Sequence, residues 1–319
     1  NGGITVDASD NVYMSGFTTS SASIASGGYD NTYNGGAADA FLVKFDPIGA
    51  RLWATYYGGT GDEGDPFNGG FTTVATDDAT GDVYLAGITK SAAGIATAGA
   101  ADVSYGGGAL YGDVFLVKFN SAGVRQWATY CGGAGDEFIG GVATDAAGNV
   151  YLSGSTQSAA GIASGGFSNA LGGTQDAFLV KYNSAGARQW ATYYGGTGIE
   201  GSSGGGNTGY VAADGAGNVY LAGSTESTTG IATAGSHQTV KAGGAGWYDA
   251  FLVKFDAAGG RIWGTYYGGT SMEDGMAVAT DPSDNVFMTG LTLSATGVAS
   301  GGFDNTYASA LGQYDAYIV

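Results

Sequence analysis

The feature that most constrains this chain is a short run that returns five times along its 319 residues. The run reads NVYMSG from Asn11, DVYLAG from Asp82, NVYLSG from Asn149, NVYLAG from Asn218 and NVFMTG from Asn285. Its valine recurs at intervals of 71, 67, 69 and 67 residues. A second run, DAFLVKF from Asp39, returns in similar form in the later units. Repeats of this length are typical of solenoids, propellers and bead-like arrays.

Each unit contains four candidate strands. They are a short run such as VATD from Val142, then the NVYLSG run, then DAFLVKF, and last a run such as RQWATYY from Arg188. The apolar period is nearer two than 3.6, and the connections are rich in Gly and Ser, which disfavour helices. Tight turns join the first strand to the second and the third to the fourth. A β-solenoid is the alternative, but its coils lack such hairpin turns, so the pattern favours propeller blades.

We therefore predict an all-β fold: a β-propeller of five four-stranded antiparallel blades, or five blades of a larger ring. One repeat domain would span residues 1–319, with units at 1–68, 69–138, 139–205, 206–274 and 275–319. The chain opens in mid-pattern and Val319 precedes the next turn and Trp strand, so we expect a fragment of a longer chain. The last blade would lack its outer strand, and self-association through that open edge is one expectation.

Composition narrows the classes of partner. The net charge is −18, so nucleic acid is not an expected partner, because phosphate binding needs clustered Lys and Arg. No run approaches the ~20 apolar residues of a membrane span, and no membrane insertion is expected. The single cysteine, Cys131, replaces a tyrosine of the sister strands and is expected to be a strand residue. The single histidine, His237, has no second histidine with which to form a catalytic or metal site.

Runs of the type VATDAAGNVYLSGST, DAFLVKFNSAG and RQWATYYGGAGDE together resemble the bacterial SBBP-type β-propeller repeat. The resemblance covers nearly the whole chain. It implies a propeller fold and a secreted or cell-surface protein, but no single activity. The connections between the second and third strands are longer than that family's pattern, which predicts elaborated loops on one face.

Acidic residues precede the first strand of four units, in the connection from one blade to the next. They are Asp62, Glu63, Asp136, Glu137, Glu200, Glu273 and Asp274. Calcium takes carboxylate and carbonyl oxygens, so these residues are candidate calcium ligands around a central channel. The alternative is a solvated rim, or carboxylates that accept hydrogen bonds from loop amides. The absence of a recognisable calcium-loop spacing favours this alternative.

Charged residues inside the strands also recur in register. The Asp that opens each third strand, such as Asp39, is expected to bond nearby amides. Lys118 and Arg125 flank one hairpin turn and are expected to form exposed pairs with Asp residues of adjacent units.

Aromatic residues in the long connections are candidate ligand-binding residues, because exposed Tyr and Trp often stack on sugar rings. The candidates are Trp247, Tyr248, Tyr105, Tyr111, Tyr33 and Tyr307. Trp247 ranks first because it is the one Trp outside the fourth strands.

These observations predict a non-enzymatic secreted or cell-surface scaffold or adhesion module that binds a surface glycan or protein through long loops on one face. One alternative is a structural subunit of an extracellular fibre, appendage or surface layer. A polysaccharide-active enzyme is the least favoured, because nothing singles out two of the many carboxylates as a catalytic pair. No cofactor is expected other than calcium.

Overall fold

The structure, a computed structural model, describes residues 2–64, 72–201, 208–308 and 312–319. Within these ranges the chain forms nineteen strands and no helix. The strands make five antiparallel sheets, four with four strands and one with three, which confirms the predicted all-β propeller fold with an incomplete last blade. No described segment is an apolar helix long enough to cross a membrane. The predicted unit boundaries at 68/69 and 205/206 lie outside the described residues.

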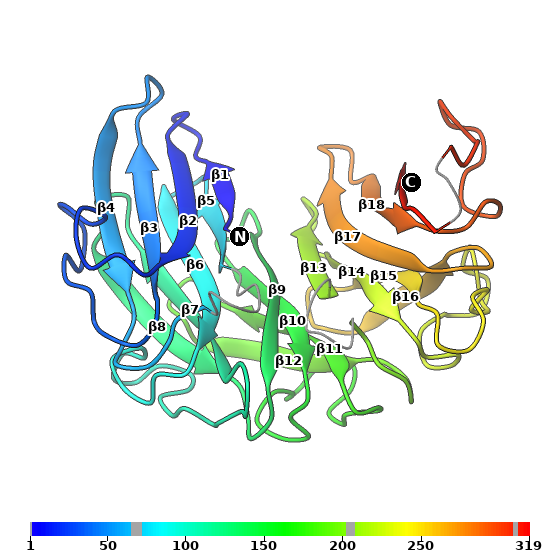
Figure 1. The fold of residues 1–319 in the computed structure, drawn as a ribbon, viewed down its shortest axis with the longest axis horizontal. Helices are drawn as coiled ribbons and strands as arrows, with labels where there is room; N and C mark the ends of the chain where they lie inside the picture. Colours follow the sequence, from blue (N-terminus) through cyan, green and yellow to red (C-terminus); the bar gives the residue numbers. More distant parts are fainter. Residues whose placement is uncertain (1, 65–71, 202–207, 309–311) are drawn as a thin grey trace. The chain divides into compact units, whose positions relative to one another are not determined.

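Neighbouring strands within each sheet are consecutive in sequence, as Figure 1 shows. The first sheet contains β1 (Ile4–Val6), β2 (Val12–Thr18), β3 (Asp39–Phe45) and β4 (Arg51–Tyr57). The second contains β5 (Thr72–Asp77), β6 (Asp82–Thr89), β7 (Asp113–Phe119) and β8 (Arg125–Cys131). The third contains β9 (Glu137–Thr144), β10 (Val150–Thr156), β11 (Asp176–Tyr182) and β12 (Arg188–Tyr194). The fourth contains β13 (Thr208–Ala213), β14 (Val219–Thr225), β15 (Asp249–Phe255) and β16 (Arg261–Tyr267). The fifth contains β17 (Glu273–Thr280), β18 (Val286–Thr292) and β19 (Asp315–Ile318).

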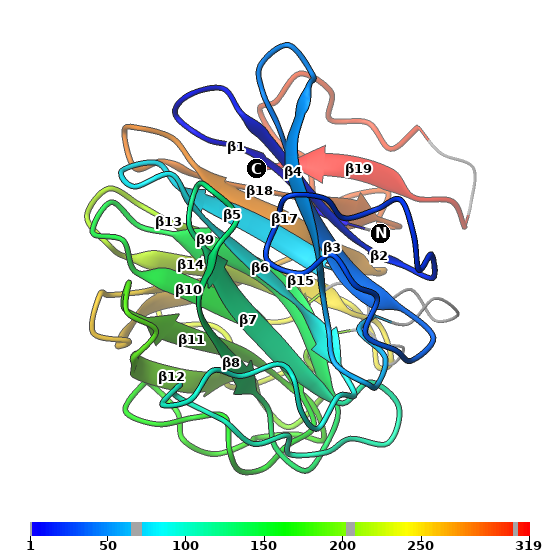
Figure 2. The same ribbon diagram turned by 90° about the vertical axis from the view of Figure 1, so that its left-hand side faces the viewer.

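The chain divides into two compact units, and the boundary passes through the third sheet. Unit 1 consists of Asn1–Leu152, Ser158–Ile162 and Val180–Gln189. Unit 2 consists of Ser153–Gln157, Ala163–Leu179 and Trp190–Val319. In unit 1, β5 packs against β1 and β2 of the preceding sheet (Figures 1 and 2). In unit 2, β17 packs against β13, β14 and β15 in the same way. The single-domain prediction for residues 1–319 stays a prediction.

The presence of glycine at the end of the NVYLSG run has a steric reason. Gly16 of β2 lies opposite Phe41 of β3 in the register, and a Cβ on Gly16 would lie 2.7 Å from the Phe41 ring. Gly87 and Phe115 repeat this pair in the second sheet, with a corresponding distance of 2.9 Å. The aromatic ring of the third strand thus lies flat over the second strand, where a side chain would exclude it.

The tight turns are built from Asp, Asn and Gly, as their sequences predict. In the turn between β7 and β8, Asn120 Oδ1 accepts hydrogen bonds from the amides of Ala122 and Val124. Gly123 closes this turn with a φ of +80°, a conformation that other residues adopt only at a cost. Because the three-residue loop ends in this glycine, the register shifts between Lys118 and Phe119.

In three sheets, the tryptophan of the fourth strand forms a hydrogen bond to the hairpin turn of the following sheet. Trp53 Nε1 donates to the Ser121 carbonyl at 3.1 Å. Trp127 donates to Ser184 and Trp190 to Ala257 in the same manner, each at 3.0 Å. We call this contact the tryptophan grip. It leaves the three indoles between 4% and 9% exposed, so the grip is a buried contact between successive sheets.

The lysine of the third strand does not make the exposed pair that the sequence predicted. Lys118 Nζ lies 2.8 Å from Asp82 of its own sheet, and the two side chains are 8% and 17% exposed. The same ammonium donates to Ser184 O of the next sheet at 3.2 Å. The prediction of exposed pairs between adjacent units was therefore wrong, because the register places each lysine beside the preceding strand of its own sheet. Arg125 stacks on the Tyr29 ring at 4.4 Å instead of forming an ion pair.

The long connection between the second and third strands runs along the outer edge of its sheet. Ser26 and Ala54 exchange two backbone hydrogen bonds of 2.9 Å, so this connection pairs with β4. Ser164 and Ala191 repeat the bridge at β12. These bridges occupy edge groups that would otherwise be open to another chain. Part of the extra length of these connections therefore protects the strand edges.

Candidate functional site

The glutamates of the acidic connections lie in or against the sheets, which corrects their expected place in open loops. β9 begins at Glu137 and β17 at Glu273, several residues before the starts that the sequence suggested. Glu63 and Glu200 form isolated bridges with Thr89 and Thr225. All four glutamates are completely buried. They are therefore withdrawn from any channel or solvent surface.

Three of these glutamates, Glu63, Glu200 and Glu273, are each held by a backbone amide and a threonine. Glu63 accepts from Gly59 N at 2.9 Å through Oε2 and from Thr89 Oγ1 at 2.6 Å through Oε1. Glu200 and Glu273 repeat this arrangement with the equivalent glycines and threonines. The repetition in successive sheets, together with the burial, indicates that these carboxyls tie one sheet to the next.

In three sheets, the Asp that opens the third strand lies close to the glutamate of the connection that follows its sheet. A Cβ on Gly58 would lie 2.2 Å from Glu63 Oε2 and 2.9 Å from Asp39 Oδ1, so the two carboxyls meet across this glycine. Asp39 also accepts a hydrogen bond from Asn34 N at 2.7 Å, which confirms the expected bond to a nearby amide. Burial raises the pKa of Glu63 to about 7 and that of Asp39 to about 6. The pair can therefore hold a proton near neutral pH, although neither carboxyl can touch a substrate.

The three aspartates of the acidic connections also have local partners. Asp62 Oδ1 accepts from Ala37 N at 2.6 Å, and Asp136 Oδ1 accepts from Tyr111 N at 2.7 Å. Asp274 accepts from Ser224 Oγ at 2.9 Å. Within the ranges that the structure describes, no group of three or more His, Cys, Asp and Glu side chains could hold a metal ion. The placement supports the alternative in which these carboxylates accept hydrogen bonds from loop amides, and calcium binding stays a prediction.

Three of the aromatic candidates pack against strand residues, two of them on the sheet from which their loop emerges and Tyr111 on the following sheet. Tyr33 lies 6.0 Å from Tyr56 between ring centroids and donates to Gly36 O. Tyr105 packs against Tyr130, and Tyr111 lies 4.6 Å from Phe138. The two remaining tyrosines are partly buried: Tyr248 accepts from Glu273 N through its carbonyl, and Tyr307 donates to the Gln313 carbonyl.

Trp247 differs from these tyrosines because its side chain is 44% exposed. Its loop is fixed by Lys241, whose Nζ donates to Gly243 O at 3.1 Å and Gly244 O at 3.2 Å. The ammonium also lies 3.9 Å from Asp249 Oδ1, with the two side chains 3% and 0% exposed. Trp247 N donates to Gly244 O at 3.1 Å. A buried ion pair and several backbone bonds therefore hold a half-exposed indole in place.

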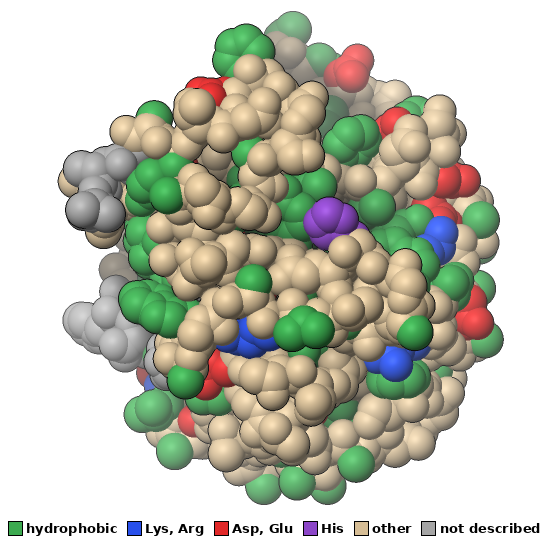
Figure 3. Space-filling model, turned by 90° about the vertical axis from the view of Figure 1, so that its right-hand side faces the viewer, with side chains coloured by type: hydrophobic (Ala, Val, Ile, Leu, Met, Phe, Trp, Pro, Cys, Tyr) green, Lys and Arg blue, Asp and Glu red, His purple; other side chains and the backbone are tan. Residues whose placement is uncertain are grey.

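The structure also reveals an apolar cavity that sequence reasoning missed. It has a volume of about 520 Å³ and is lined by, among others, His237, Ile262, Trp263, Tyr267, Met288 and Val319. The single histidine, purple in Figure 3, lies at the surface among hydrophobic side chains, and its ring stacks on Tyr267 at 5.8 Å.

Comparisons with known proteins agree with the fold. Residues 126–159 match the family model described as SBBP, Beta-propeller repeat, which confirms the resemblance to an SBBP-type repeat. No curated protein matches the chain.

Among solved structures, a protein of unknown function from Dyadobacter fermentans is similar at 9% identity and a TM-score of 0.46, covering 92% of this chain and 74% of that chain. Two mutants of the Synechocystis apocarotenoid oxygenase are similar at 10% and 11% identity, each with a TM-score of 0.36. These matches cover 90% and 99% of this chain. The chain spans 53% and 58% of the length of these oxygenases.

Proposed function

We propose that this protein is a non-enzymatic propeller module that binds a surface glycan, with Trp247 as the centre of its binding site. The observation that carries the proposal is the half-exposed indole held on a loop that Lys241 and Asp249 fix from beneath. A rigid aromatic face lowers the ordering cost of binding, and a sugar ring can stack on it. The surrounding glycine-rich backbone adds carbonyl and amide groups that can bond to hydroxyls.

The non-enzymatic part of the proposal is supported by the placement of the reactive groups. The paired carboxyls of Asp39 and Glu63 are fully buried, so neither can contact a polysaccharide. Burial raises the pKa of the Cys131 thiol to about 12, so this sulfur is not an activated nucleophile. An extracellular or cell-surface location is part of the proposal and is supported by the resemblance to the SBBP-type repeat.

A glycan array probed with the labelled chain tests the proposal. Trp247→Ala should weaken binding to any recognised glycan at least tenfold and leave the melting temperature unchanged, because the indole is half exposed. Leu110→Ala is the matched control, since Leu110 is a 63% exposed loop residue of another sheet. Silence across a broad array, or equal binding by the Trp247 variant, would refute glycan recognition at this loop. A protein captured only by chains that carry Trp247 would identify a protein ligand instead.

A second candidate function, a structural subunit of an extracellular assembly, is favoured by the edge of β19. This strand is the last of a three-stranded sheet, whereas the other sheets add a fourth strand at the same position. An open strand edge is a place where another polypeptide can pair. Negative-stain microscopy of the concentrated chain would test this function, and uniformly monomeric particles would argue against it.

A further inference from the structure

The arginine that opens a fourth strand is covered, in two sheets, by an aromatic ring from the connection of the preceding sheet. The Arg125 guanidinium lies 4.4 Å from the centroid of the Tyr29 ring. The Arg261 guanidinium lies at the same distance from the Phe167 ring. Arg125 and Arg261 are partly buried, whereas Arg188, which opens β12, is exposed. The residue that faces each arginine explains this difference.

An alanine stands in the place of the ring beside Arg188. The residue after Tyr29 donates its backbone amide to the hydroxyl of the β4 threonine at 2.8 Å. The residue after Ala101 donates in the same way to the β8 threonine at 2.9 Å, so Ala101 holds the position of Tyr29. A methyl group is too short to cover a guanidinium, and the place of the ring becomes a pocket.

This pocket has a volume of about 460 Å³. Ala101 and Arg188 line it together with Thr97, Ala187 and their neighbours. Its size is that of a small-molecule site, for which about 300–1,000 Å³ is usual. All of its lining residues belong to unit 1, whereas Trp247 of the proposed glycan site belongs to unit 2, so the two proposals are tested separately.

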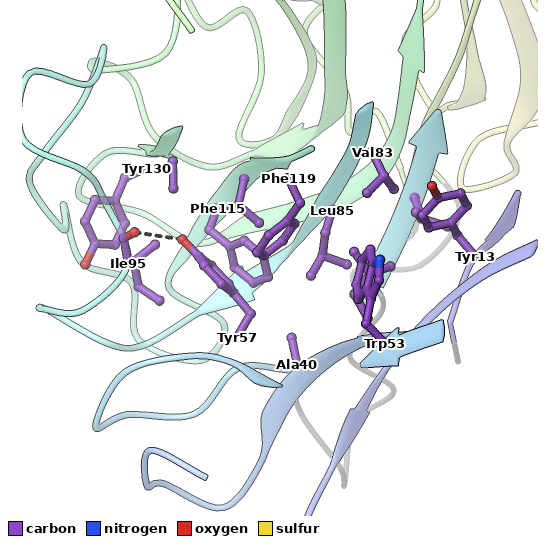
Figure 4. Close-up of a cluster of buried hydrophobic side chains, with 14 residues drawn as sticks. Tyr13, Ala40, Trp53, Tyr57, Val83, Leu85, Ile95, Phe115, Phe119 and Tyr130 are labelled. Atoms are coloured by element: carbon purple, nitrogen blue, oxygen red, sulfur yellow. Dashed lines mark hydrogen bonds between the residues drawn. The ribbon is translucent and has the colours of Figure 1, made fainter. Parts of the chain in front are cut away.

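The core between these two sheets is closed, so the pocket is a feature of the surface and not a packing gap. Between the first two sheets, the Tyr29 ring packs on Phe119 at 6.2 Å, and Phe119 packs on Tyr57 at 5.9 Å (Figure 4). Between the second and third sheets, Tyr182 and Cys131 take the places of Phe119 and Tyr57 in the repeat. They are 1% and 4% exposed although an alanine replaces the ring above them.

The guanidinium of Arg188 is fixed by the same kind of bond as that of a covered arginine. Arg188 Nη1 donates to the Ile162 carbonyl at 3.2 Å. Arg261 Nη1 donates to the Ile231 carbonyl at 3.3 Å. A guanidinium that is already held loses little freedom when a ligand binds, and it attracts the face of an aromatic ring.

Two tight turns form the sides of the pocket. In one turn, Ala100 N donates to Thr97 O at 3.1 Å. In the other, Gly186 N donates to Asn183 O at 2.9 Å. An extended peptide binds by pairing with a strand edge, whereas two facing turns suit a compact molecule.

We propose that the pocket between Ala101 and Arg188 binds a small aromatic molecule, whose phenyl or phenol ring stacks on the guanidinium. The ring takes the place that Tyr29 and Phe167 occupy over the two covered arginines. The scaffold has already accepted both a phenol and a phenyl ring at this position, which is why the ligand is assigned to this chemical class.

The test is a titration of the isotope-labelled chain with p-cresol, which is the tyrosine side chain as a free molecule, followed by amide chemical shifts. The amides of Ala101 and Ala187 should shift saturably. Methylcyclohexanol has a similar size but no aromatic face, so it should bind about threefold more weakly, which is the value of an exposed cation–π contact. Equal binding of the two compounds, or no saturable shift with p-cresol, would overturn the proposal.

Two variants at residue 101 show whether the place of the ring is the binding site. Ala101→Tyr supplies a tethered ring and should abolish the p-cresol shift at Ala187. Ala101→Ser is the matched control, which leaves the space open and should keep the shift. Because Ala101 is exposed, neither change should unfold the chain. Unchanged p-cresol binding by Ala101→Tyr would show that the ligand does not occupy this place.

A third variant transfers the site to another sheet. Tyr29→Ala uncovers Arg125 and should add a second set of saturable p-cresol shifts, at the amide of Val124. If only the original amides shift in this variant, the arginine is not the partner of the ring and the proposal fails. Tighter binding of a peptide with the sequence of residues 27–30 than of p-cresol would overturn the small-molecule assignment in favour of an aromatic side chain of a partner polypeptide.

Discussion

The tryptophan grip makes a quantitative prediction at one glycine. Gly123 and Gly49 occupy the same position of the turn in successive sheets, with φ of +80° and +85°. A Cβ on Gly123 would lie 2.9 Å from Trp53 Cδ2, whereas a Cβ on Gly49 would meet nothing within 4 Å. Replacing each glycine with alanine therefore imposes the same backbone strain, and only Gly123→Ala adds a clash with the indole.

The backbone strain of alanine at positive φ costs about 1 kcal/mol. Overpacking against a buried ring adds about 1–3 kcal/mol. We therefore expect Gly49→Ala to lower the free energy of unfolding by about 1 kcal/mol and Gly123→Ala to lower it by about 2–4 kcal/mol. Urea denaturation, followed by tryptophan fluorescence, measures the free energy of unfolding of both variants. The two values are compared with a common dependence of that free energy on urea concentration. Equal losses in the two variants would refute the grip as an energetic link between sheets.

Three further predictions concern buried polar groups. Burial raises the pKa of Glu63 and Glu200 from 4.5 to about 7, so their contribution to stability is complete below pH 4.5 and is lost as the pH rises to 7. The urea midpoint should fall across this range, and Glu63→Gln should reduce the fall; a midpoint that rises with pH would contradict the assignment. Tyr57→Phe should cost about 1 kcal/mol, because the hydroxyl donates to the buried Ile95 carbonyl at 2.7 Å, and an unchanged midpoint would show that this bond adds no stability. Cys131 should react with a thiol reagent only when the chain unfolds, and fast labelling of the native chain would show that the strand is open.

Much of the fold could be predicted from the repeat. The four strands of a unit, their order and the turn residues follow from apolar period and from Asp, Asn and Gly at fixed places. The NVYLSG and DAFLVKF runs also indicate the register between the second and third strands. The glycine of the first run must lie opposite the phenylalanine of the second, as Gly16 lies opposite Phe41. These features are local or repeat in every unit, which is why the sequence alone reveals them.

The candidate site could be predicted only in part. Trp247 is exposed as expected, but Glu137 and Glu273 begin strands although their acidic neighbours suggested loops. The buried glutamates depend on a nearby Gly-Gly pair and on a threonine from another segment. The spacing of acidic residues along the sequence does not distinguish such a buried carboxyl from an exposed loop carboxyl. The ion pair of Lys118 with Asp82 was misplaced for a similar reason, because a repeat does not say whether a contact lies within a unit or between units.

The tryptophan grip has a direction along the chain, because each of the three indoles contacts the turn of a sheet that lies later in the sequence and is synthesised later. A nascent chain of this kind displays one vacant indole at its newest sheet, and the next unit to emerge carries the turn that fills it. Duplicating a whole unit inserts a new indole and a new turn together, so the chain can lengthen by gene duplication without the invention of another contact surface.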